Sequence, residues 1–135
     1  MTCVWKAVSC CLTAADLLRV FNVSQKGPIR PVKLLRLLKK HNRRTDQVHY
    51  QGRCLSVQQL EENYRWIKEI GNVNDGYYCS TCDPLFLLLA ELFECHIIHR
   101  YQELEVHYEY QGLARSTWTL SSDSKHLTFL SKTYG

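Results

Sequence analysis

The chain has 135 residues, of which 45% are hydrophobic and 22% are charged, and its formal net charge is +4. This length and composition fit one globular domain, residues 1–135, and exclude a low-complexity chain. No apolar run approaches the ~20 residues that a membrane-spanning helix requires, so we expect no membrane segment. The N-terminus lacks the cleavage site of a secretory signal. The seven cysteines therefore favour a reducing compartment, cytosol or nucleus, and suggest metal ligands, a reactive thiol or buried small side chains.

The first predicted helices follow local capping signals. Thr13, followed three residues later by Asp16, resembles an N-cap with an acidic first turn, and predicts a short helix over 14–21. Pro31 suits the first position of a second helix, because its missing N–H group has no partner to lose there.

That second helix is amphipathic and basic. Residues 33–44 carry six of the chain's 17 Lys and Arg residues. These are Lys33, Arg36, Lys39, Lys40, Arg43 and Arg44. Two interpretations remain open: a solvated helix face, or an electrostatic patch that binds RNA or another acidic partner such as a host protein.

Two further helices are predicted in the middle of the chain. Ser56 and Gln59 form a capping box for a helix over 57–69. Asp83 caps another helix, which we expect to end near Cys95 and which is apolar on nearly all sides. A helix of that composition lies within the core.

Beyond this helix the hydrophobic period becomes that of a strand. Leu104, Val106, Tyr108 and Tyr110 alternate with Glu105, His107 and Glu109. Two more strand-like segments follow, separated by the turn S-S-D-S at 121–124. The order predicts an α+β fold in which N-terminal helices pack on a C-terminal antiparallel sheet.

One stretch has the spacing of zinc ligands. Cys79-x2-Cys82-x12-Cys95-x3-His99 resembles a finger motif with cysteine in place of its first histidine. In that interpretation Cys95 and His99 lie one turn apart at a helix end and the four residues hold a structural zinc. The alternative is that the cysteines belong to a buried helix and its loop, and that His99 lies in a strand.

A second set of residues suggests thiol chemistry. A thiol hydrolase needs a cysteine at a helix N-terminus, where the helix dipole favours the thiolate, and a histidine that exchanges its proton. Cys3 and His107 are the first candidates for these roles, and Glu105 or Glu109 would orient the imidazole. Cys54 and Cys82 are the alternative nucleophiles, and His126 is the alternative base.

Several short pieces together resemble a known family. They are C-V-W-K-A-V at 3–8, G-R-C-L at 52–55, His107 on its strand, and the terminal L-T-F-L-S-K-T-Y-G with Tyr134 and Gly135. In these pieces the chain resembles the papain-like leader autoproteases of positive-strand RNA viruses, in particular those of the first nonstructural proteins of arteriviruses.

The resemblance implies a papain-like cysteine endopeptidase of the host cytosol. It implies that Cys3 is the nucleophile, that His107 is the base, and that the enzyme cleaves its own polyprotein after Gly135, with Tyr134 and Gly135 left at the end. A role as an antagonist of the host is also expected. The non-enzymatic alternative is a small zinc-binding regulatory protein that binds RNA or a host protein through the basic helix.

Overall fold

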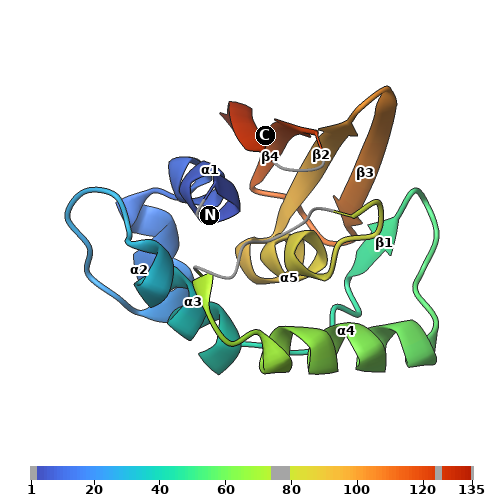
Figure 1. Ribbon diagram of the computed structural model, residues 1–135, viewed down its shortest axis with the longest axis horizontal. Coiled ribbons are helices and arrows are strands. Elements are labelled where there is room, and N and C mark those ends of the chain that lie inside the picture. Colours follow the sequence, from blue (N-terminus) through green and yellow to red (C-terminus); the bar gives the residue numbers. More distant parts are fainter. Residues whose placement is uncertain (1–2, 74–79, 124–125, 135) are drawn as a thin grey trace.

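The computed structural model describes residues 3–73, 80–123 and 126–134. Within these ranges, five helices, most of them N-terminal, accompany a five-stranded sheet that is mostly C-terminal, so the α+β class is confirmed. Figure 1 shows the helices gathered on one side of the sheet. None of the helices in these ranges combines the length and the apolar character needed to cross a membrane.

The described helices are α1 Cys3–Cys11, α2 Ala14–Phe21, α3 Pro31–Lys40, α4 Val57–Glu69 and α5 Pro84–Phe93. Three of them, α2, α4 and α5, begin where their capping residues predict. The side chains of Thr13 and Asp16 close a capping box on α2, and Ser56 with Gln59 does the same for α4. Asp83 accepts a hydrogen bond from the backbone N–H of Leu85 at 3.0 Å and so caps α5.

Helix α5 ends earlier than the sequence predicts. Glu94 adopts a left-handed conformation, with a φ of 52°, and terminates the helix after Phe93. Cys95, which we expected at the end of this helix, instead begins a strand. Glu94 occupies this conformation with its carboxylate held by Arg115 and by the hydroxyl of Tyr110.

The sheet is mixed and not purely antiparallel. Its strands are β1 Val48–Tyr50, β2 Cys95–Tyr101, β3 Leu104–Tyr110, β4 Ser116–Ser122 and β5 Leu127–Tyr134, in the order β1-β3-β2-β4-β5. β2 and β3 form a hairpin, after which the chain returns so that β4 pairs with β2 in parallel. The expected antiparallel pairing is therefore wrong for this one pair, because β4 lies on the other side of β2 from β3.

The two faces of the sheet differ in what lies over them. One face packs against α5 and α1, and we call it the covered face. Its residues include Ile97, His99, Val106, Tyr108, Trp118 and Leu120, all buried. The other side chains of the same strands form the open face, which no helix in the described part of the chain covers (Figure 1). Its residues include His96, Ile98, Arg100, Glu105, His107 and Thr119.

Candidate active site

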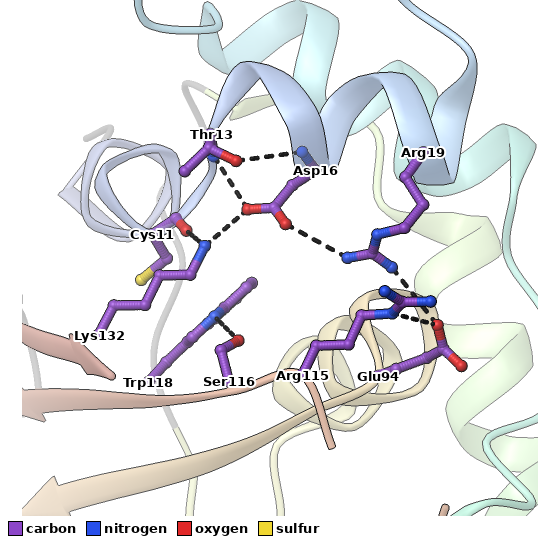
Figure 2. Close-up of polar contacts among 9 residues, drawn as sticks. All are labelled: Cys11, Thr13, Asp16, Arg19, Glu94, Arg115, Ser116, Trp118 and Lys132. Carbon is purple, nitrogen blue, oxygen red and sulfur yellow. Dashed lines mark hydrogen bonds and ion pairs between the residues drawn. The ribbon is translucent and has the colours of Figure 1, made fainter. Parts of the chain in front are cut away.

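Helix α1 packs along β5, the edge strand of the sheet. Its side chains Val4, Trp5 and Val8 are buried, and their packing attaches the helix to the core. At its last residue, the carbonyl oxygen of Cys11 accepts a hydrogen bond of 2.7 Å from Nζ of Lys132 on β5. The same Nζ contacts Oδ2 of Asp16 at 2.6 Å, and Figure 2 shows both bonds converging on this one ammonium group.

These contacts belong to a chain of charges that fixes α1 and α2 on the sheet (Figure 2). Asp16 pairs with Arg19 at 3.2 Å, Arg19 reaches Glu94 at 3.4 Å, and Arg115 binds the same carboxylate at 3.0 Å. Burial opposes ionisation of Asp16, but the hydrogen bonds from Lys132 and Thr13 outweigh it and lower the pKa of this carboxyl. The hydrogen bond from Arg115 lowers the pKa of Glu94. Both carboxylates are therefore ionised at neutral pH.

The contact at Lys132 fixes one end of α1 on the strand. Lys132 is the sixth residue of β5, and Cys11 is the last residue of α1. The C-terminal end of α1 therefore lies beside the C-terminal part of β5. Cys3 begins the helix, which rises about 12 Å between these two residues.

His126 stands at the start of β5, in the turn that leads from β4. Its backbone N–H donates to Oδ1 of Asp123 at 2.8 Å, and the N–H of Asp123 donates to the carbonyl of His126 at 3.1 Å. Nδ1 of the imidazole lies 3.7 Å from the same Oδ1. The ring is 62% exposed, so it is open to substrate and to solvent. The turn thus presents an imidazole beside a carboxylate at the start of β5.

A buried histidine, His99, contacts the strand residue that precedes this turn. Nε2 of His99 lies 2.5 Å from Oγ of Ser122, the residue before Asp123, and the carbonyl of Ser122 accepts from the N–H of Gln102 at 3.2 Å. Burial lowers the pKa of His99 to about 4, so its ring is neutral at physiological pH. The zinc hypothesis made His99 a metal ligand, and its alternative placed His99 in a strand, which is where it lies. The contact with Ser122 was not predicted.

His107 lies on a different strand from the one against which α1 packs. His107 lies on the open face of β3, where its Nε2 is 3.0 Å from Oε1 of Glu105. Strands β2 and β4 separate β3 from β5, and α1 lies over the covered face. Of the two carboxylates expected beside this imidazole, Glu105 is the one in contact.

The alternative nucleophiles lie in different surroundings. Cys54 is exposed in the connection between β1 and α4, where it lines an open cavity of about 780 Å³ with Tyr50, Arg53 and Gln59. Cys82 is half-buried before α5, and burial, with the nearby charge of Asp83, raises the pKa of its thiol. A thiol with a raised pKa forms less of the reactive thiolate.

The four expected zinc ligands do not assemble as the motif predicts. Cys79 lies outside the described residues. Cys95 and His99 are four positions apart in a strand, about 13 Å, whereas zinc binds each ligand at about 2.0–2.3 Å. The expected helical spacing of this pair is therefore wrong, and the two side chains cannot hold one ion. Among the described residues, no group of three or more His, Cys, Asp and Glu side chains is placed to bind a metal.

The chain's C-terminal end lies far from His126. Tyr134 is the last residue of β5 and is 69% exposed. The strand from Leu127 to Tyr134 spans about 23 Å, so the two ends of β5 open at opposite edges of the molecule. Gly135, the expected cleavage point, lies outside the described residues.

The six basic residues of the predicted patch occupy α3 and the loop after it. Arg43 pairs with the buried carboxylate of Glu91 at 2.6 Å, and Arg44 pairs with Glu61 at 3.1 Å. Lys33 donates to the side chain of Gln25, and Lys39 donates to the carbonyl of Ile70. Arg36 and Lys40 are exposed and make no hydrogen bond or ion pair with any described residue.

Comparisons of this chain with protein-family models, with curated proteins and with solved structures find no match.

Proposed function

We propose that this protein is a cysteine hydrolase that cleaves amide bonds, with Cys3 as nucleophile and His126 as general base. The observation that supports the proposal is that α1, which begins at Cys3, packs against β5, the strand that follows His126. The carboxylate of Asp123 lies 3.7 Å from Nδ1 of the imidazole, a distance at which it favours the charged form of the ring. A thiol at a helix start, an imidazole and a carboxylate in this order are the elements that thiol hydrolysis requires.

The chemistry follows from these positions. The N-terminal end of a helix dipole favours a negative charge, so α1 stabilises the thiolate of Cys3 after His126 accepts its proton. The thiolate attacks the carbonyl carbon of the substrate, and the C–N bond breaks as His126 returns the proton to the leaving amine. Water, deprotonated by the same imidazole, then hydrolyses the thioester and frees Cys3. The carboxylate of Asp123 stabilises the imidazolium formed in each half-reaction.

The position of the C-terminus favours a substrate supplied by another chain. Tyr134 lies at the far end of β5 from His126, about 23 Å along the strand. We expect cleavage after Gly135 to occur between two molecules, because Tyr134 ends the strand that His126 precedes. The zinc-binding alternative has less support, because Cys95 and His99 lie too far apart to share an ion.

The first test measures the reactivity of each thiol and needs no knowledge of the substrate. Site-resolved alkylation by iodoacetamide at pH 6.5, read by mass spectrometry, compares Cys3 with Cys54, which is exposed close to the start of α4. We expect Cys3 to react about tenfold faster, because a helix terminus and a histidine partner raise its thiolate fraction. His126→Gln removes this advantage, whereas the matched control His107→Gln retains it. Equal rates for Cys3 in these two variants would exclude His126 as its partner.

A second test addresses the substrate. The chain is translated with a tag after Gly135, and release is followed at several protein concentrations, in the unmodified sequence and in Cys3→Ala. A rate that rises with concentration and vanishes in Cys3→Ala supports cleavage between molecules. Release at a rate independent of concentration would instead establish self-cleavage after Gly135.

A further inference from the structure

The charge of this protein is concentrated in one continuous segment. Residues 17–45 hold nine of the 17 Lys and Arg residues and none of the 13 Asp and Glu residues. The remaining residues therefore carry eight basic and 13 acidic side chains, a net charge of −5 beside +9 in the segment. A net charge of +4 conceals this separation of the two signs.

The fold keeps the segment together at one end of the molecule. It comprises most of α2, the connection to α3, and α3 itself, which Figure 1 shows at the end of the long axis remote from β1 and β3. The apolar side of α3, with Leu34, Leu35 and Leu38, is buried in the core. Its basic residues consequently point outward and, with those of the preceding connection, form one surface.

Four cations of this surface have no carboxylate partner in the described part of the chain. Lys26, Arg30, Arg36 and Lys40 are exposed and pair with no described carboxylate. Arg36 and Lys40 are four residues apart on one side of α3 and therefore lie about 6 Å apart along it. A row of unpaired cations held at this spacing by a rigid helix generates a positive field that only an external anion can balance.

The chemistry of the surface favours a polyphosphate partner over an acidic protein. The centres of protein–protein interfaces are rich in aromatic residues and poor in lysine. Here the segment presents four lysines, its aromatic residue Phe21 is buried, and its exposed large hydrophobic side chains are Leu18 and Val32. Contacts to nucleic-acid phosphates need only such point charges and no apolar anchor.

We propose that the surface formed by Lys26, Arg30, Arg36 and Lys40 binds the phosphate backbone of RNA without reading its sequence. Arg30 is the N-cap residue of α3 and Lys26 lies in the connection before it, so all four cations belong to one continuous stretch of chain. This function is independent of the thiol chemistry, because α3 contributes no residue to the pair of Cys3 and His126.

The test uses fluorescence anisotropy with a labelled, mixed-sequence single-stranded RNA of 20 nucleotides and the full chain, at several salt concentrations. The variant Arg36→Gln/Lys40→Gln removes two cations from the surface. Loss of two phosphate contacts weakens binding about tenfold and reduces the slope of log K against log salt by about 1.4. The matched control Arg53→Gln/Arg100→Gln removes the same net charge from the β1 side of the molecule, and we expect it to bind RNA within about twofold of the unmodified chain.

Each result supports or overturns the proposal. Equal affinity for DNA of the same length and for a second RNA sequence supports it, since the contacts are to phosphates. Equal weakening by both double variants shows that net charge alone drives binding and overturns it. If polyglutamate of matched charge competes as strongly as unlabelled RNA, the surface recognises an acidic protein instead.

Discussion

The two faces of the sheet treat the same type of residue in opposite ways. His99 on the covered face of β2 is fully buried, with its Nε2 against Ser122 and its ring 4.8 Å from that of Phe86. His107 on the open face of β3 is exposed and meets the equally exposed carboxylate of Glu105. The two residues are close in the sheet, because His99 pairs with Val106 and His107 pairs with Ile98. What distinguishes them is the layer of helices on one face only.

The polar groups of the covered face therefore support the fold, whereas those of the open face are accessible to solvent. On the covered face, polar groups are few, and each one that bonds fixes an element: His99 anchors the turn of Asp123, and Lys132 holds α1 and α2. On the open face a polar pair exchanges its contact for water at little free-energy cost. Substitutions on the two faces should therefore differ sharply in their effect on stability.

The largest effect is expected for Trp118→Ala. Trp118 is completely buried on β4, and its ring lies 5.6 Å from that of Phe93. Its removal leaves a cavity under α5 and should reduce the free energy of unfolding by about 3–5 kcal/mol. The neighbouring open-face substitution Thr119→Ala is the control, with an expected change within about 0.5 kcal/mol. Urea unfolding measures both, and similar losses would contradict the contrast between the faces.

The second prediction concerns the dependence of stability on pH that His99 causes. The pKa of His99 is about 4 in the folded chain, below its usual value near 6.5. Between these two values the unfolded chain binds a proton that the folded chain does not, so stability falls as the pH decreases from 6.5 to 4. The fall attributable to this residue is about 3 kcal/mol.

The variant His99→Asn isolates that effect. Its free energy of unfolding, followed from pH 7 to pH 4.5, should change less steeply than that of the unmodified chain, whatever its absolute stability. His107→Gln should leave the slope intact. A slope that is unchanged in His99→Asn would show that this imidazole is not buried in its neutral form.

The third prediction concerns the ammonium group shown in Figure 2. Lys132→Met leaves the carboxylate of Asp16, whose side chain is only 15% exposed, without its 2.6 Å partner. We expect a loss of about 2 kcal/mol at pH 7, smaller than for a fully buried pair. The double variant Lys132→Met/Asp16→Asn should recover part of the loss, and failure to do so would assign it to packing alone.

The pair of Lys132 and Asp16 also makes stability fall as the pH decreases. Here the folded state favours the charged form of Asp16, whereas it disfavours the charged form of His99. The pKa of Asp16 is lowered in the folded state, so its contribution to stability is complete above its usual value near 3.8. The contribution disappears as the pH falls through the lower folded value. In Lys132→Met this acid-side loss should be smaller, as unfolding experiments below pH 4 would reveal.

Local signals in the sequence predicted much of the fold. Capping residues act within one helical turn, so Thr13, Ser56 and Asp83 marked the starts of three helices correctly. The alternation of 104–110 likewise predicted β3, because the period of a strand is local. These features depend on few neighbours and no distant contact.

Two features depend on distant contacts and were missed. The apolar residues continue from α5 through β2 without Gly or Pro, so nothing local marked the change of element at Glu94, whose conformation is supported by Arg115. The parallel pairing of β2 with β4 is likewise set by which strands meet in space. The first of these decides the zinc motif, since Cys95 and His99 would be neighbours on a helix but are not on a strand.

The same limit applies to the choice between His107 and His126. A cysteine at a helix start can be predicted from the sequence, but its partner depends on the strand beside that helix. The alternation along β3 predicted that His107 lies on the polar face, away from the face that carries Val106 and Tyr108. Only the structure shows that α1 packs on β5, which β2 and β4 separate from β3.

The smallest effect is therefore expected for His107→Gln, although the sequence nominated this residue as the base. Its contact with Glu105 joins two side chains that are 42% and 51% exposed, and pairs of this kind contribute about 0–1 kcal/mol. We expect the free energy of unfolding to change by less than about 0.5 kcal/mol and the alkylation rate of Cys3 to stay the same. Unfolding in urea and labelling with iodoacetamide measure the two quantities on one preparation. If Cys3 were labelled more slowly in His107→Gln while the free energy of unfolding stayed the same, His107 would act on the thiol of Cys3. That result would refute the functional separation of the two faces.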